Sequence, residues 1–108
     1  MCFTSVVEQW FRDQWGGSLM LPDGWYGRPY DNQHSLTSVK ESGDILVLIL
    51  DQKLELRFEG LMSVSPRNQE LVFGPFNKLR FECEGYDDGR RLSKEYRTGE
   101  VKIVSSPG

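Results

Sequence analysis

The chain is poor in the residue types on which most catalytic and metal-binding motifs depend. Its 108 residues include one histidine and two cysteines. Cys2 and Cys83 lie far apart, whereas zinc motifs need cysteine and histidine ligands at short, regular spacing. The sequence also contains no calcium-binding loop and no glycine-rich loop with the Gly-Lys-Ser/Thr ending of a phosphate site. We therefore expect no metal and no cofactor.

Long apolar runs and a basic excess are missing too. The longest apolar run, residues 45–50, is far too short to cross a bilayer, and residues 1–11 lack the basic start and apolar stretch of a signal peptide. The formal net charge of −3 disfavours non-specific binding of nucleic acid, which depends on basic patches. We expect a cytoplasmic protein with free thiols that binds neither nucleic acid nor membrane. A bridge between Cys2 and Cys83 stays open as an alternative.

The residues that are present suit one folded domain over residues 1–108. A hydrophobic content of 38% and an aromatic content of 12% support a single core. One helical pattern covers residues 4–15, and Ser5 with Glu8 has the spacing of a capping box. Gly16 and Gly17 then provide a stop signal. The apolar face needs a broad sheet as its partner, because it carries large side chains: Val6, Val7, Trp10, Phe11 and Trp15.

The rest of the chain has the pattern of β-strands. Residues 18–21 are expected to be extended, and further strands are expected at 34–41, 45–50, 54–59, 61–64, 70–73, 76–84, 92–97 and 100–104. The short link at Asp51-Gln52 predicts an antiparallel hairpin, and Thr98-Gly99 predicts another between the last two strands. Residues 65–68 are expected to form a loop. The predicted fold class is α+β: an N-terminal helix against one face of an antiparallel β-meander or partly closed barrel of about six to eight strands.

Between the helix and these strands lies an irregular segment, residues 21–34, with the sequence LPDGWYGRPYDNQH. Pro22-Asp23-Gly24 has the chemistry of a turn, and Asp31-Asn32 can turn the chain again. The residue before Pro29 favours extended geometry. A flexible linker would be rich in glycine and serine and would lack the aromatic residues found here. We therefore expect a braced loop.

Two interpretations of this segment stay open. In the structural one, its aromatic side chains close the end of the core, Arg28 pairs with a carboxylate and His34 bonds a backbone group. In the functional one, the segment is a recognition surface, since Trp, Tyr and Arg dominate binding hot spots and long ordered loops are often functional. The candidate binding residues are Asp23, Trp25, Tyr26, Arg28, Tyr30, Asp31, Asn32 and His34.

The same fourteen-letter segment resembles a signature of small bacterial proteins of about this length whose activity is uncharacterised. The resemblance covers residues 21–34 well and the β-rich remainder loosely. It implies a bacterial origin, and it carries no activity, cofactor or mechanism over to this chain.

Two functional hypotheses follow. The first is a non-enzymatic binding module that uses residues 21–34 to engage another protein, such as a toxin, as small bacterial immunity proteins do. The alternative is an enzyme or small-ligand site in which His34 acts as an acid or base with Asp31 or Asp23, beside Arg28. Cys83 lies on the apolar phase of its strand and is expected to be an inert core thiol. A third possibility is a homodimer formed through an uncovered sheet face or edge.

Overall fold

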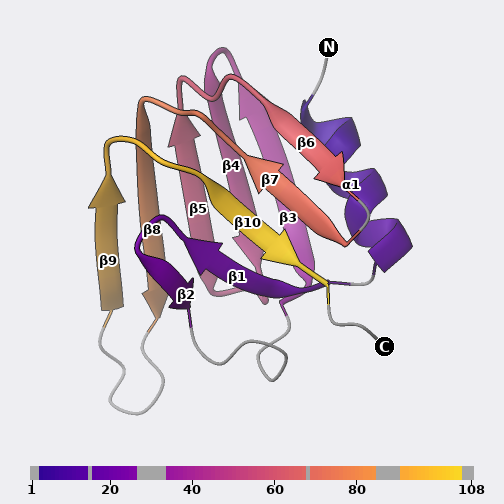
Figure 1. The fold of residues 1–108 in the computed structure, drawn as a ribbon. Helices are drawn as coiled ribbons and strands as arrows, with labels where there is room; N and C mark the ends of the chain where they lie inside the picture. Colours follow the sequence, from indigo (N-terminus) through magenta and orange to yellow (C-terminus); the bar gives the residue numbers. More distant parts are fainter. Residues whose placement is uncertain (1–2, 15, 27–33, 68, 85–90, 106–108) are drawn as a thin grey trace.

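The computed structural model describes residues 3–14, 16–26, 34–67, 69–84 and 91–105. In this part of the chain one helix is followed by ten strands (Figure 1). The elements are α1 (Phe3–Gln14), β1 (Ser18–Leu21), β2 (Gly24–Tyr26), β3 (Leu36–Ser42), β4 (Ile45–Leu50), β5 (Leu54–Glu59), β6 (Val64–Arg67), β7 (Glu70–Phe73), β8 (Lys78–Glu84), β9 (Arg91–Tyr96) and β10 (Val101–Val104).

The strands form two five-stranded antiparallel sheets. The front sheet, nearer the viewer in Figure 1, has the order β2-β1-β10-β7-β6, and the back sheet has the order β3-β4-β5-β8-β9. The predicted α+β class and the docked N-terminal helix are confirmed. The described strands outnumber the six to eight expected, and they divide into two open sheets that do not close into a barrel.

The core lies between the two sheets and follows the period-two alternation of the strands. In β5, Leu54, Leu56 and Phe58 are fully buried while the residues between them face outward. Phe58 stacks on Phe73 of the front sheet with ring centroids 5.1 Å apart. Each such buried aromatic or aliphatic side chain contributes about 1.5–3 kcal/mol through removal of apolar surface from water.

Strand β4 shows how an apolar run is divided between two faces. Leu46, Leu48 and Leu50 point into the core, whereas Ile45, Val47 and Ile49 are half-buried on the outer face. The sequence suggested a strand covered on both faces or in the centre of a sheet. The structure places it between β3 and β5 with one face in the core.

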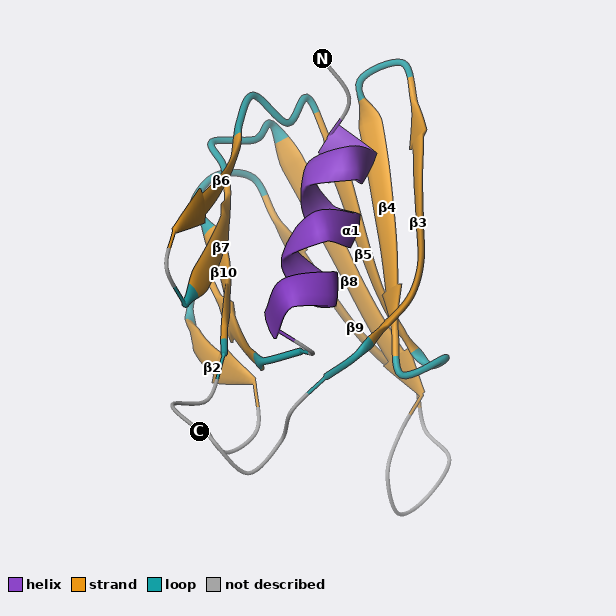
Figure 2. Ribbon diagram, turned by 90° about the vertical axis from the view of Figure 1, so that its right-hand side faces the viewer, coloured by secondary structure: helices purple, strands orange, loops and turns teal. Residues whose placement is uncertain are grey.

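Helix α1 fills the opening between the two sheets at one side (Figure 2). It contacts β3, an edge strand of the back sheet, and β6, an edge strand of the front sheet. Val7, Trp10 and Phe11 are buried in the common core. The helix was expected to lie on one sheet face. It packs against two edges, because two facing sheets leave their edge strands uncovered and an apolar helix can cover both.

The start of α1 corrects a second expectation. The helix begins at Phe3, so Ser5 lies inside it and cannot act as the first residue of a capping box. A carboxylate from β3 serves instead: Glu41 Oε1 accepts hydrogen bonds from Phe3 N at 3.0 Å, Thr4 N at 3.3 Å and Thr4 Oγ1 at 3.3 Å. The helix is therefore capped by the sheet on which it packs.

The hairpin predicted at Asp51-Gln52 is confirmed, with continuous pairing of β4 and β5 from Ile45↔Glu59 to Leu50↔Leu54. The hairpin predicted at Thr98-Gly99 is wrong. Strand β9 pairs with β8 in the back sheet, while β10 lies between β1 and β7 in the front sheet. Thr98-Gly99 instead lies in the connection that crosses from the back sheet to the front sheet, because the apolar face of β10 is buried in the centre of the front sheet.

The loop predicted at residues 65–68 is also wrong over the part that the structure describes, since β6 occupies residues 64–67 and pairs with β7. The strand predicted at 61–64 begins only at its last residue. Pro66 is accommodated because β6 is an edge strand, where one side of the backbone has no neighbouring strand that needs an N–H donor.

Two further expectations concern the cysteines and membrane-spanning segments. Cys83 is buried in the core, as its place on the apolar phase of its strand predicted. The alternative of a Cys2–Cys83 bridge involves Cys2, which lies outside the described residues. No helix in the described ranges has the length and apolar character needed to span a membrane.

Candidate functional site

Both ends of the predicted recognition segment, residues 21–34, are attached to strands. At the first end, the predicted Pro-Asp-Gly turn joins β1 to β2, with Leu21 paired to Gly24 and Gly24 at a φ of +133°. Asp23, at the tip of this turn, reaches the back sheet. Its Oδ1 accepts a hydrogen bond from the Tyr96 hydroxyl at 2.9 Å, and its Oδ2 lies 3.7 Å from Lys94 Nζ. The turn of one sheet is thereby tied to β9 of the other.

The environment of Tyr96 reflects this bond. Partial burial raises the pKa of the Tyr96 hydroxyl to about 12, and the hydrogen bond and negative charge of Asp23 act in the same direction. The neutral phenol is thus favoured, because its hydroxyl donates a hydrogen bond to the negatively charged Asp23 carboxylate.

At the second end of the segment, His34 is buried, with 4% of its surface exposed. Its backbone pairs with Gly17, just before β1: His34 N donates to Gly17 O at 2.7 Å, and Gly17 N donates to His34 O at 3.1 Å. Gly16 has a φ of +139°, and a side chain there would collide with the carbonyl of His34. Gly16 thus allows the close approach of His34, and a side chain at Gly17 would collide with the carbonyl of Val104.

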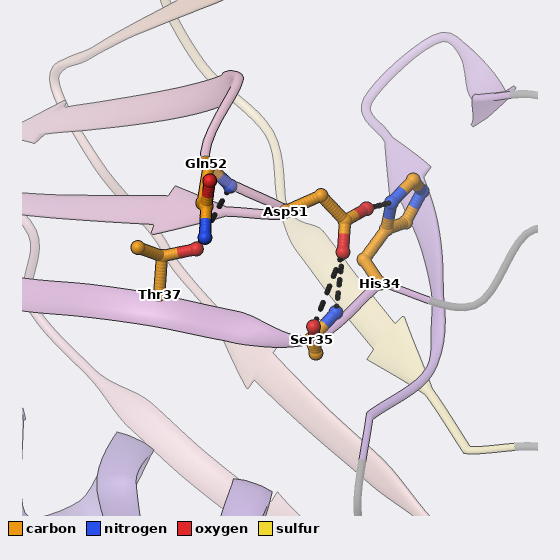
Figure 3. Close-up of polar contacts among 5 residues, drawn as sticks. All are labelled: His34, Ser35, Thr37, Asp51 and Gln52. Carbon is orange, nitrogen blue, oxygen red and sulfur yellow. Dashed lines mark hydrogen bonds and ion pairs between the residues drawn. The ribbon is translucent and has the colours of Figure 1, made fainter.

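The side chain of His34 bonds Asp51, which lies in the turn between β4 and β5 (Figure 3). The distance from Nδ1 to Oδ2 is 2.6 Å. The other carboxylate oxygen accepts hydrogen bonds from Ser35 N at 2.9 Å and from Ser35 Oγ at 3.2 Å. We call the group Gly17, His34, Ser35 and Asp51 the His34 junction.

Asp51 is held in its ionised form by these contacts. Burial by itself would raise its pKa, but the hydrogen bond from Ser35 N–H, the bond and charge of His34, and the Ser35 hydroxyl together hold the pKa of Asp51 below its ordinary value of 3.8. The carboxylate is therefore a fixed negative charge inside the junction.

The turn that carries Asp51 has an unusual backbone. Asp51 and Gln52 have φ values of 53° and 63°, in the left-handed region that residues with a side chain rarely adopt. The strain is offset by bonds to the segment after His34: Asp51 N donates to Ser35 O at 2.9 Å, and Gln52 N donates to Thr37 Oγ1 at 2.8 Å (Figure 3). The turn and the start of β3 thus stabilise each other.

Serine, histidine and aspartate also make up a catalytic triad, but their arrangement here is different. In a triad the serine hydroxyl bonds the imidazole, which takes its proton. Here Ser35 Oγ bonds the carboxylate of Asp51, and the imidazole is buried. This geometry suits a structural clamp, because the Ser35 hydroxyl bonds the carboxylate and not the imidazole.

Of the residues in the acid–base hypothesis, the structure describes Asp23 and His34, and these two bond different partners. Asp23 bonds Tyr96 at one end of the segment, and His34 bonds Asp51 at the other. The backbones of Trp25 and Tyr26 lie in β2, opposite Met20 and Leu19. Four predicted site residues lie outside the described residues: Arg28, Tyr30, Asp31 and Asn32. The partner that sequence reasoning missed is Asp51, whose only signal was its place in a predicted turn.

A groove of about 520 Å³ lies elsewhere, between α1 and β6. Val6 and Trp10 lie along it, and its other lining residues are polar or exposed: Ser5, Gln9, Asp13, Gln14, Pro66 and Arg67. No group of three or more metal-ligating side chains occurs in the part of the chain that the structure describes.

Comparisons of the chain with protein families, curated proteins and solved structures found no match.

Proposed function

We propose that the protein is a non-enzymatic binding module that recognises another protein through residues 21–34. The observation that carries this proposal is the attachment of both ends of the segment to the two-sheet scaffold. Asp23 fixes the first end to Tyr96, and the His34 junction fixes the second. Recognition residues are commonly found on loops held by a rigid framework, because fixed ends lower the entropy lost on binding.

The composition of the segment supports protein recognition. Trp25, Arg28 and Tyr30 belong to the residue types that dominate interface hot spots. The titratable groups at its two ends are engaged in structural bonds, which favours binding over acid–base chemistry. A toxin of the kind neutralised by small bacterial immunity proteins is one partner of this class. A cytoplasmic setting is part of the proposal, because the chain has only two cysteines.

The test is affinity capture from a bacterial lysate with quantitative mass spectrometry. We expect the triple variant (Trp25→Ala, Arg28→Ala and Tyr30→Ala) to capture at least about tenfold less of the partner than the wild type does, because removing hot-spot residues has an effect of this order. Met62→Ala is the matched control, because Met62 is 66% exposed and lies outside the segment. It should capture as the wild type does.

Thermal unfolding of each variant separates recognition from structure. A triple variant that melts close to the wild type and loses the partner supports the proposal. A variant that melts several degrees lower and still captures the partner would show that the segment has a structural role only.

A further inference from the structure

On the outer face of the back sheet, β5 and β8 place like charges opposite each other at two neighbouring positions, whereas the next pair, Glu59 and Lys78, is of opposite sign. The strand register places Glu55 directly opposite Glu82, and Arg57 directly opposite Arg80. Like charges directly opposite one another on neighbouring strands are destabilising. A sheet that served only as a solvated surface would gain by alternating them. The two like-charged pairs are therefore candidates for a role beyond folding.

Each row continues on the neighbouring strands. The acidic row extends to Ile49 on β4 and to Ser93 on β9. The basic row extends to Val47 on β4, and on β9 it ends at an acidic residue, Glu95. Two residues along a strand span about 6.8 Å, so the rows lie side by side at roughly that spacing.

The outer face is open to a partner. Figure 2 shows the back sheet at the right, with α1 and the front sheet on its inner side and no described element over its outer side. Arg57 and Arg80 are exposed, and the aliphatic residues of β4 on this face are half-buried: Ile45, Val47 and Ile49. The centre of the face thus combines an aliphatic stripe with two charged rows.

We infer that this face binds a second copy of the chain. A two-fold axis parallel to the rows and midway between them turns one sheet over onto the other. The acidic row of each copy then faces the basic row of its partner, so that Arg57 opposes Glu55 and Arg80 opposes Glu82. Such an interface is isologous, because the same patch serves both copies.

The same rotation also aligns the aliphatic residues of β4. Val47 of one copy opposes Ile49 of the other, which joins the two aliphatic stripes. The twist of a sheet turns successive strands about an axis perpendicular to them. A two-fold rotation about that axis therefore keeps the strands of the two copies parallel to each other across the whole face. A charge-complementary surface that fits itself under one symmetry operation argues for a second copy over an unrelated protein.

Within one copy, Arg80 Nε already lies 3.3 Å from Glu82 Oε1, and Lys78 Nζ lies 3.4 Å from Glu95 Oε1. These pairs lie at the surface, with the Glu82 side chain half-buried, and surface ion pairs contribute little by themselves. Dimerisation adds a second carboxylate to each arginine and excludes water from both. A face of five strands measures roughly 500 Å², which is small for an interface, so the dimer is expected to be weak and sensitive to salt.

Sedimentation equilibrium of the wild-type protein is the first test. Between about 10 µM and about 1 mM we expect the average mass to rise from one chain towards two, as for an interface of this size. Raising the salt concentration to about 1 M should shift the equilibrium back towards the monomer. A monomer over the whole range, or a dimer that salt leaves unchanged, overturns the inference.

Charge variants test the geometry. The acidic-face variant (Arg57→Glu with Arg80→Glu) and the basic-face variant (Glu55→Arg with Glu82→Arg) should each weaken self-association at least about tenfold, because like rows then face each other. An equimolar mixture should form a heterodimer. Arg12→Glu, on the exposed side of α1, is the control and should associate as the wild type does.

Separate variants that dimerise as the wild type does, or a mixture that stays monomeric with both variants folded, would refute the two-fold arrangement. If either variant fails to fold, the wild-type mass and its salt dependence decide the question.

Discussion

The two ends of segment 21–34 are attached by similar chemistry in different surroundings. Asp51 bonds His34 in a junction where the ring is 4% exposed, and it accepts two further hydrogen bonds from Ser35. Asp23 bonds Tyr96 and faces Lys94 at the surface, where its side chain is 56% exposed. Because water competes for exposed partners, the Asp51 carboxylate at the His34 junction should stabilise the fold much more than the Asp23 carboxylate at the Tyr96 bond.

The largest effect is expected for His34→Ala. The substitution removes a buried ring and leaves the Asp51 carboxylate without its closest partner, which should lower the free energy of unfolding by about 3 kcal/mol. Chemical denaturation measures this value, with Met62→Ala as an exposed control that should change stability by less than about 0.5 kcal/mol. Equal stabilities for His34→Ala and the control would show that the junction contributes nothing.

Asp51→Asn should sharpen the comparison through its pH dependence. Asparagine tolerates the left-handed backbone of this turn, so the change tests mainly the charge, and a loss of about 1–2 kcal/mol is expected at neutral pH. The folded-state pKa of Asp51 lies below its ordinary value of 3.8, so its stabilisation is present above that value and is lost as the pH falls through the folded-state pKa.

Unfolding free energies of the wild type and Asp51→Asn, measured from neutral pH down to about pH 2, should therefore converge at the acid end. A difference that stays constant over this range would contradict the assignment of the stabilising charge to Asp51.

The smallest effect on stability is expected at the exposed Asp23–Tyr96 bond. Its pH dependence should appear in alkaline solution, whereas that of Asp51 appears in acid. Tyr96→Phe should cost less than about 1 kcal/mol at neutral pH. Because the folded-state pKa of Tyr96 is raised to about 12, its stabilisation is present below the ordinary value of 10.0 and is lost as the pH rises through about 12.

Ultraviolet titration of the tyrosines measures this directly. One of the four tyrosines should titrate near pH 12 in the wild type and should be missing in Tyr96→Phe. Asp23→Asn should move that titration towards the ordinary value. A Tyr96 that titrates with the others in the wild-type protein would mean that the bond to Asp23 does not persist in solution.

Local signals predicted the elements well where partner strands are neighbours in sequence. The β4–β5 hairpin followed from alternation on both sides of a short turn, and β8 followed from the alternation of Leu79, Phe81 and Cys83 with charged residues. The turn at Pro22-Asp23-Gly24 was likewise predictable, because its residue types constrain φ directly.

The same local signals failed where a strand's partner is distant. Thr98-Gly99 has the composition of a hairpin turn, yet the strands beside it enter different sheets. Pro66 suggested a loop although β6 pairs with its sequence neighbour β7, because the sequence did not show that β6 lies at a sheet edge, where proline is accommodated. The candidate site shows the same limit, since the contact of His34 with Asp51 joins residues that share no motif.

The amino-acid sequence by itself determined most of the extended segments, the apolar face of the helix and the turns at Pro22-Asp23-Gly24 and Asp51-Gln52, because these depend on side-chain period and on backbone preferences at single residues. The tertiary structure decided that the strands divide into two sheets, that Glu41 caps the helix and that Asp51 holds His34. Those outcomes depend on which apolar faces bury each other, a choice made by the whole core and not by any one segment.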